Sequence, residues 1–147
     1  RIALLLFLCG TVLADDRRAE VNYMLHCQGC HLPEAEGHEG RVPPMKDFVG
    51  YFLHSKEGRD FLIRVPGVAH AALDDEQLAE LMNWIVLTFS AAQLPDPFAP
   101  YSIDEVAALR ADPDQDPNAT RQKILAWLAT RLPDVEAVLG NESSGRR

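Results

Sequence analysis

The sequence predicts an all-α fold, and three observations support that prediction. Hydrophobic residues recur every three or four positions in several segments, which is the period of an amphipathic helix. The alternation of polar and apolar residues that marks a half-buried strand is not evident anywhere in the sequence. Glycines, prolines and acidic capping residues divide the chain into short stretches of helical length.

The first expected helix begins at Asp15 or Asp16. Either residue can serve as the N-cap, because an acidic side chain stabilises the positive end of a helix. This helix carries Ala19 and Tyr23 on successive turns. A loop over residues 32–45 is expected next, because glycines and prolines are concentrated there.

Three further helices are expected before residue 90. One covers about 46–56 and stops at Gly58, and a short one covers about 59–65 and stops at Pro66. The last has Asp74 or Asp75 as its N-cap. Its hydrophobic stripe consists of Leu78, Leu81, Met82, Ile85 and Phe89.

The composition changes after Phe89. A proline-rich linker is expected over residues 90–100, followed by a fifth helix that opens with a capping box at Ser102 to Glu105 and ends near Arg110. A sixth helix over 119–132 is expected to have Asn118 as its N-cap, and the tail after Gly140 is expected to be disordered. The sixth helix is expected to pack against the rest of the chain through Ile124, Leu125, Trp127 and Leu128.

Residues 1–14 have the pattern of a secretory signal peptide. Arg1 supplies a positive charge, residues 2–12 are mostly apolar, and the run ends in small residues near Ala14. The apolar run is too short to span a bilayer. A lipid anchor on Cys9 is the alternative, although Leu8 is larger than a lipid-attachment site tolerates. We therefore expect a signal peptide at 1–14, a domain at 15–89 and an extension at 90–147.

The charge of the chain is strongly acidic. The 147 residues contain 14 Lys and Arg against 22 Asp and Glu, which gives a net charge of −8. Nucleic acid is therefore an unsuitable partner, because phosphate binding needs a basic face. An acidic surface either steers the protein toward basic patches on another protein or keeps it soluble. After removal of the signal peptide, no remaining segment is long and apolar enough to cross a membrane.

The most specific motif is Cys27-Gln28-Gly29-Cys30-His31. Two cysteines three positions apart and followed at once by a histidine form the attachment site of a c-type haem. The thiols of Cys27 and Cys30 add across the haem vinyl groups, and His31 then binds the iron. A thioredoxin-like redox pair would need a preceding strand, whereas a helix is expected here. A structural zinc site would need four ligands. The motif therefore predicts one covalently bound haem c with its iron.

Residues 19 to 89, approximately, resemble the class I cytochrome c family. In that family the first helix leads into the haem motif and crosses the last helix. On the first helix, the contact uses a small residue and an aromatic residue four positions later. On the last helix, it uses an apolar residue and an aromatic residue three positions later. Ala19 and Tyr23 match the first pair, and Leu81 and Trp84 match the second. The resemblance implies a cytochrome c-like helical fold around one haem, and it does not cover residues 90–147.

The resemblance also implies roles for Pro43 and Met45. The family places a proline twelve residues after the iron-binding histidine, and its carbonyl accepts a hydrogen bond from the other ring nitrogen of that histidine. Pro43 occupies this position. Such a bond fixes the ring and tunes the iron. The residue two positions later is usually a leucine packed on the same haem face, and here it is Met45.

The sequence departs from the family where the sixth iron ligand is expected. The family usually supplies a methionine from the loop before the last helix, and the loop at 65–72 contains His70 and no methionine. We expect His70 to bind the iron opposite His31, with Met45 or an open or water-bound position as the alternatives. Arg41 and Arg64 are candidates to pair with the haem propionates, because arginine suits carboxylates.

The expected function is electron carriage in the periplasm, with the haem iron cycling between its ferric and ferrous states. The expected partners are redox proteins, namely a periplasmic dehydrogenase as donor and another cytochrome or an oxidase as acceptor. No substrate is expected to be turned over. One alternative is a haem protein with an open distal site that binds a small ligand or reduces peroxide. Another is a cytochrome subunit of a larger periplasmic dehydrogenase, with residues 90–147 as its docking arm.

Overall fold

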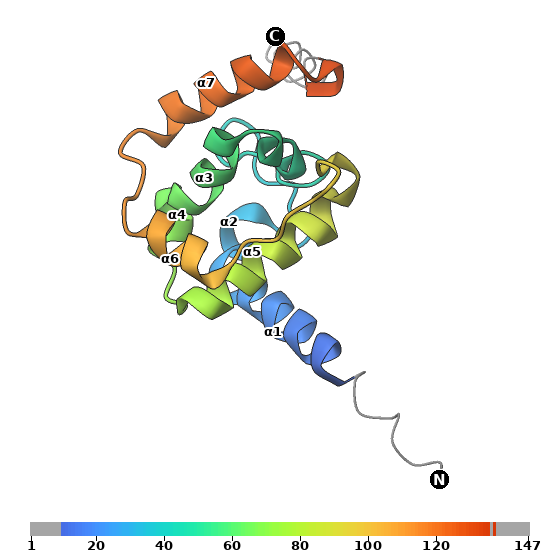
Figure 1. Ribbon diagram of the computed structural model, residues 1–147, viewed down its shortest axis with the longest axis vertical. Coiled ribbons are helices and arrows are strands. Elements are labelled where there is room, and N and C mark those ends of the chain that lie inside the picture. The colour runs from blue at the N-terminus through green and yellow to red at the C-terminus, as the bar shows by residue number, and fades with distance from the viewer. Residues whose placement is uncertain (1–9, 136, 138–147) are drawn as a thin grey trace.

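The computed structural model describes residues 10–135 and 137, and these are folded into helices joined by loops (Figure 1). The expectation of an all-α fold is confirmed, since the described residues contain no strand and only one isolated β-bridge, between His38 and Val42. Residues 1–9 of the expected signal peptide and the expected disordered tail lie outside the described residues. None of the described helices is long and apolar enough to span a membrane.

The first helix, α1 (Gly10–His26), crosses the longest helix of the second half, α5 (Asp75–Ser90). Ala19 is 1% exposed at this crossing. The ring of Tyr23 lies 5.6 Å from that of Trp84 and 5.1 Å from that of Phe89. This arrangement confirms the helix crossing that the resemblance implies.

Helix α1 begins earlier than expected. The prediction of an N-cap at Asp15 or Asp16 is wrong, because the helix continues back to Gly10. Residues 11–14 contain no breaker, and their leucine and alanine are strong helix formers.

Helix α5 begins as predicted. The Asp74 side chain accepts a hydrogen bond from the Gln77 backbone N–H at 2.8 Å, and the Gln77 side chain accepts one from the Asp74 backbone N–H at 3.4 Å. This capping box fixes the register of the helix. The register in turn determines which residues face the core, and these are Leu78, Leu81, Met82, Ile85 and Val86.

The segment from 46 to 65 differs from the prediction. It forms a 3-10 helix, η1 (Val49–His54), and then α3 (Lys56–Arg64), which passes through Gly58 without a break. Ser55 is the N-cap of α3, and its side chain accepts a hydrogen bond from the Gly58 backbone N–H at 2.9 Å. A Cβ atom at Gly58 would lie 2.2 Å from the carbonyl oxygen of Phe52. The glycine therefore permits close packing of α3 on η1 and does not end a helix.

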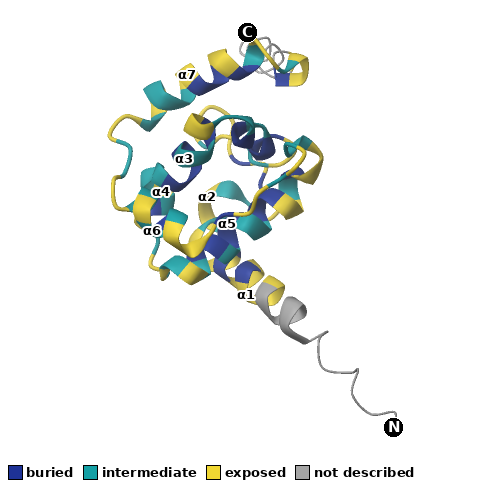
Figure 2. Ribbon diagram, viewed as in Figure 1, coloured by how far each residue is buried: buried dark blue, intermediate teal, exposed yellow. Residues whose placement is uncertain are grey.

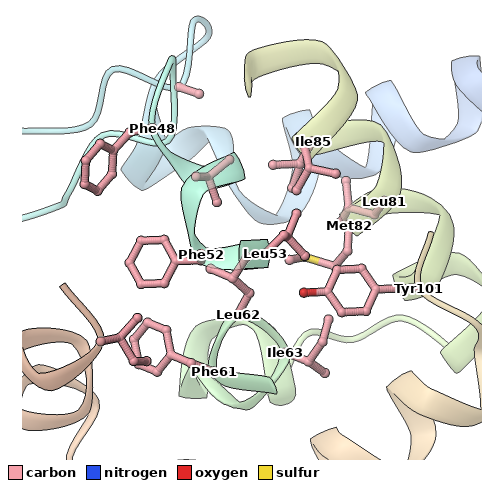
Figure 3. Close-up of a cluster of buried hydrophobic side chains, with 14 of the residues drawn as sticks. Phe48, Phe52, Leu53, Phe61, Leu62, Ile63, Leu81, Met82, Ile85 and Tyr101 are labelled. Carbon is pink, nitrogen blue, oxygen red and sulfur yellow. The ribbon is translucent and has the colours of Figure 1, made fainter. Parts of the chain in front are cut away.

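Two short helices complete this half of the molecule. The haem motif forms α2 (Gln28–His31), and the loop expected at 65–72 contains α4 (Pro66–Ala69). Figure 3 shows the core that joins η1, α3 and α5, in which Phe52, Leu62 and Met82 lie close together.

The C-terminal extension consists of η2 (Ala91–Gln93), α6 (Ile103–Arg110) and α7 (Pro117–Ala129). Ser102 caps α6 as predicted, but the capping box is incomplete because the Glu105 carboxylate pairs with Arg59 at 2.6 Å. The N-cap of α7 is Asp116, so the prediction of Asn118 is wrong. Pro117 occupies the first turn of α7, where its missing N–H costs no helix bond.

The extension packs against the rest of the molecule, as expected from its apolar face. Helix α6 contacts α3 and α5, and α7 contacts α3 and η1. Trp127 is an exception to the expected face, because it is 39% exposed and is covered on one side by the Arg131 guanidinium. Figure 2 shows the buried faces of these helices turned toward the core, which the extension enters with Tyr101, Val106, Ile124, Leu125, Leu128 and Val135.

Candidate haem site

The haem motif lies at the junction of α1 and α2. The His31 backbone N–H donates to the Cys27 carbonyl at 2.9 Å, which forms one helical turn. Residues three and four positions apart lie on the same face of such a turn, so Cys27, Cys30 and His31 are grouped together. Neither cysteine is in a disulfide. The motif therefore offers two thiols and one imidazole from a single turn of chain.

An apolar cavity of about 260 Å³ adjoins this turn, and Cys27 and His31 form part of its wall. Pro43 and Met45 also line it, so the structure brings four of the predicted site residues together. Cys30 lies outside the lining, on the exposed side of the same turn. The apolar wall is completed by Pro44, Val49, Phe52, Phe61, Leu62, Val65, Val68, Met82 and Ile85.

Burial changes the protonation of the motif. It lowers the pKa of His31, and the backbone of Pro43 opposes this shift. Burial, together with the neighbouring Cys30, raises the pKa of the Cys27 thiol to about 11. The imidazole is therefore held neutral, which is the form that binds a metal ion.

The backbone of Pro43, the residue that the resemblance assigns to this role, acts on the His31 ring and raises the pKa of His31. Nδ1 is buried and makes no hydrogen bond of ordinary geometry to a described residue. The contact with Pro43 thus acts on the pKa of His31 without being a full hydrogen bond.

The loop that carries Pro43 is fixed by backbone hydrogen bonds. The Gly37 N–H donates to the His31 carbonyl at 3.0 Å, and the Met45 N–H donates to the Ala35 carbonyl at 2.8 Å. Gly37 has a φ of +67°, and a Cβ atom there would lie 2.4 Å from the Val42 carbonyl oxygen. Only glycine fits this turn. The turn holds Pro43 and Met45 on the His31 side of the cavity.

His70 is not brought to the cavity. It is exposed, it follows the last residue of α4, and it is absent from the lining. Arg110 holds the backbone around it by donating to the carbonyls of Ala69 at 3.1 Å and Ala71 at 2.7 Å. Arg110 also donates to the carbonyl of Leu73 at 2.8 Å. The expectation that His70 binds the iron is therefore not supported by its position.

The two arginines expected to meet the haem propionates also lie elsewhere. Arg64 donates to the carboxylate of Asp112 at 2.7 Å and to the carbonyl of the same residue at 2.7 Å. Arg41 is exposed and is absent from the lining of the cavity.

The first turns of α7 were missed by the sequence analysis. Pro117, Asn118 and Arg121 line the same cavity as Cys27 and His31. A signal for this was present in the sequence, because Arg121 precedes Ile124, Leu125 and Leu128 by three, four and seven positions and so shares their helix face.

The donor set and the cavity fit a haem. Two thiols and a neutral imidazole come from one turn, and the adjoining cavity is walled by hydrophobic side chains that would cover a flat apolar ring. An all-α fold with this motif between two crossing helices defines a c-type cytochrome.

Comparison with known proteins agrees with this class. One cytochrome c-552 of Thermus thermophilus is 30% identical over 139 residues, which cover 82% of this chain and 89% of that protein. A second cytochrome c-552 of Thermus thermophilus is 30% identical over 118 residues, which cover 68% of this chain and 86% of that protein. No protein-family model matches the chain. The chain belongs to the family of c-type cytochromes, and its cofactor is covalently bound haem c with iron.

Proposed function

We propose that this cytochrome carries single electrons between redox proteins in the periplasm, with its haem joined to Cys27 and Cys30 and its iron bound by His31. The observation that carries the proposal is the placement of a neutral imidazole and a thiol from one turn on the wall of an apolar cavity. When bound, the haem supplies an iron centre that accepts and releases one electron.

The chain's own residues hold this centre and limit its chemistry. The loop at 35–45 is held to the His31 backbone by hydrogen bonds, and the hydrophobic wall would exclude water from the ring of a bound haem. The net charge of −8 favours partners with basic surfaces, because opposite charges speed encounter. The proposed donor is a periplasmic dehydrogenase, and the proposed acceptor is another cytochrome or an oxidase. The signal-like pattern of residues 1–14 supports the periplasmic location.

Met82 is the proposed sixth ligand. Besides Cys27, the side chains on the wall that contain a sulfur atom are Met45 and Met82. Met45 follows Pro43 in the loop that holds His31, so it belongs to the His31 side. Met82 comes from α5 and is 4% exposed. Its thioether is a ligand of the kind that electron-carrying cytochromes use.

A second candidate function is favoured by the position of His70. Because this histidine is exposed and outside the cavity, the described wall offers no second imidazole. If Met82 does not bind the iron, the sixth position is open to a small ligand such as carbon monoxide or peroxide.

Spectroscopy of the purified, haem-loaded protein separates the two functions. An electron carrier is expected to be low-spin in both oxidation states, to titrate reversibly with one electron and to take up carbon monoxide poorly. High-spin iron in the wild type, with rapid uptake of carbon monoxide by the ferrous form, would contradict electron carriage and support the function with an open sixth position. Sedimentation of the same sample tests the subunit alternative, because a carrier is expected to be stable as a monomer.

A further inference from the structure

The segment between α3 and α5 has one side on the haem cavity and one side away from it. Val65 and Val68 line the cavity, whereas His70 is exposed and lies outside the lining. His70 is only two positions beyond Val68, and two residues of chain span at most about 7 Å. Residues two positions apart do not share a face of a helical turn. The course of the backbone after Val68 therefore sets how far this imidazole lies from the cavity.

The hydrogen bonds within this segment are local. The Ala69 N–H donates to the Val65 carbonyl at 2.9 Å, and the His70 N–H donates to the Pro66 carbonyl at 3.1 Å. Each of these bonds joins residues four positions apart, so it shapes the turn without tying it to another element. The His70 ring makes no hydrogen bond or ion pair with any residue that the structure describes. A contact from elsewhere in the fold must therefore hold the turn in place.

Arg110 supplies that contact from the last turn of α6. All three nitrogens of its guanidinium donate to backbone carbonyls on the two sides of His70, and one of them also donates to the Asp75 carboxylate at 3.0 Å. The carbonyls are those of Ala69, Ala71 and Leu73, at 3.1, 2.7 and 2.8 Å. The Arg110 side chain is 16% exposed. A single side chain of the extension thus spans the backbone from 69 to 73.

Helix α6 is itself held firmly, so Arg110 has a fixed origin. Ser102 caps the helix by accepting from the Glu105 N–H at 3.2 Å, and Val106 is completely buried. The Glu105 carboxylate pairs with Arg59 of α3 at 2.6 Å. Helix α6 lies beside α4 and also contacts α3 and α5 (Figure 1). The position of the turn that carries His70 is therefore set by the C-terminal extension.

We propose that Arg110 is a positioning residue of the haem site, which keeps His70 off the iron by holding the backbone at 69–73. It leaves the sixth position to Met82 or to an external ligand. Loss of Arg110 is expected to let the turn move and His70 bind, because imidazole is a good ligand for iron. The inference rests on the proposed binding of the iron by His31. It gives the extension a part in selecting the sixth ligand, although Arg110 lies outside the lining of the cavity.

The test compares absorption and magnetic-resonance spectra of four haem-loaded proteins: the wild type, Arg110→Ala, the double variant Arg110→Ala with His70→Ala, and Arg64→Ala. Arg110→Ala is expected to give low-spin iron with two imidazole ligands, and the double variant is expected to lose that signature. A second imidazole in place of a thioether lowers the potential. At the wild-type midpoint, the ratio of reduced to oxidised protein is then expected to fall at least about tenfold in Arg110→Ala, which is about 59 mV.

Arg64→Ala is the matched control. Arg64 also donates to one carbonyl and one carboxylate, but both belong to Asp112 and lie outside 69–73. Its loss is expected to leave the spectrum of the wild type. Amide hydrogen exchange supplies a second readout that does not depend on the iron. Exchange at 69–73 is expected to become faster in Arg110→Ala and to stay unchanged in Arg64→Ala.

Four outcomes would overturn the proposal. They are two imidazole ligands in the wild type, an unchanged spectrum in Arg110→Ala, an imidazole-pair signature that persists without His70, and an equal change in Arg64→Ala. Arg110→Gln covers the case in which Arg110→Ala does not fold, because its amide can still donate to one carbonyl. It is expected to show the imidazole pair in part of the sample, and absence of that signal would count against the proposal.

Failure of the electron-carrier function has a different signature. If the wild type takes up carbon monoxide rapidly while Arg110→Ala does so only after His70 is also replaced, electron carriage fails and the role of Arg110 stands. If the wild type is low-spin with one imidazole and Arg110→Ala has the same spectrum, electron carriage stands and the role of Arg110 fails.

Discussion

His31 and His70 show how differently one residue type can be placed within a short protein. His31 lies on the cavity wall, where burial lowers its pKa and keeps the ring neutral. His70 is exposed at the end of α4, and Arg110 binds the carbonyls on both sides of it. These hydrogen bonds hold the backbone on both sides of His70 in its observed place, outside the cavity lining. The position of each histidine therefore favours His31 over His70 as the proposed iron ligand.

At the residue scale, His70→Ala is expected to leave the spin state, the midpoint potential and carbon monoxide binding of the haem-loaded protein unchanged. Met82→Leu is expected to produce high-spin iron that takes up carbon monoxide, because leucine fills a similar volume and has no donor atom. Absorption and magnetic-resonance spectra of both oxidation states measure these effects.

Met45→Leu is the control for the loss of a thioether on the His31 side of the cavity, and its iron is expected to stay low-spin. High-spin iron in His70→Ala with an unchanged spectrum in Met82→Leu would reverse the assignment. It would show that the loop at 65–72 rearranges when haem is bound.

At the element scale, the packing of α3 on η1 depends on Gly58. Alanine at this position would place a Cβ atom 2.2 Å from the Phe52 carbonyl oxygen, so the backbone would have to move. Gly58→Ala is expected to lower the free energy of unfolding by about 2 kcal/mol, as measured by denaturant titration. Gly67→Ala is the control, because no atom lies within 4 Å of its Cβ position. A Gly58→Ala protein as stable as the wild type would show that α3 can shift freely.

Arg110 links α6 to the start of α5 and to the turn after α4. Its side chain is 16% exposed and donates to three carbonyls and to the Asp75 carboxylate. Arg110→Ala is expected to cost about 2 kcal/mol of stability and to speed amide hydrogen exchange at residues 69–73. Arg131→Ala is the comparison, since Arg131 stacks on the exposed Trp127 and its loss is expected to cost no more than about 0.5 kcal/mol. Unchanged exchange at 69–73 in Arg110→Ala would contradict the role given to Arg110.

The elements that could be predicted from the sequence are those determined by local signals. The haem motif and the start of α5 depend on residues within one helical turn, and the structure has both. The prediction of a helix break at Gly58 was wrong, because the glycine is needed for close approach to the Phe52 carbonyl oxygen. The local sequence pattern does not reveal that contact. The position of His70 and the entry of Arg121 into the cavity wall likewise depend on contacts between segments far apart in the sequence.

At the scale of the whole molecule, the extension and the haem-binding half share one core. Tyr101 donates a hydrogen bond to the Arg59 carbonyl at 2.8 Å, and the Arg59 guanidinium lies 4.1 Å from the centre of the Tyr101 ring. Burial raises the pKa of Tyr101 well above its ordinary value of 10.0. Arg59 also holds Glu105 and lowers the pKa of that carboxyl. These contacts join α3 to the linker and to α6.

A chain that ends after Leu94 is therefore expected to be less stable than the full chain and to self-associate. It would expose the faces of α3 and η1 that α6 and α7 cover, including Phe61 and Ile63. Thermal unfolding and analytical ultracentrifugation of the haem-loaded proteins measure the two effects. A truncated chain that is equally stable and monomeric would mean that the extension is a docking arm for a partner.

The cavity wall is built from both ends of the described chain, and this has a consequence for the order in which the protein matures. Cys27 and Cys30 are made early, whereas Pro117, Asn118 and Arg121 are among the last described residues to leave the ribosome. Until α7 has been synthesised, the pocket thus lacks one of its sides. The wall is complete only when α7 packs against α3 and η1.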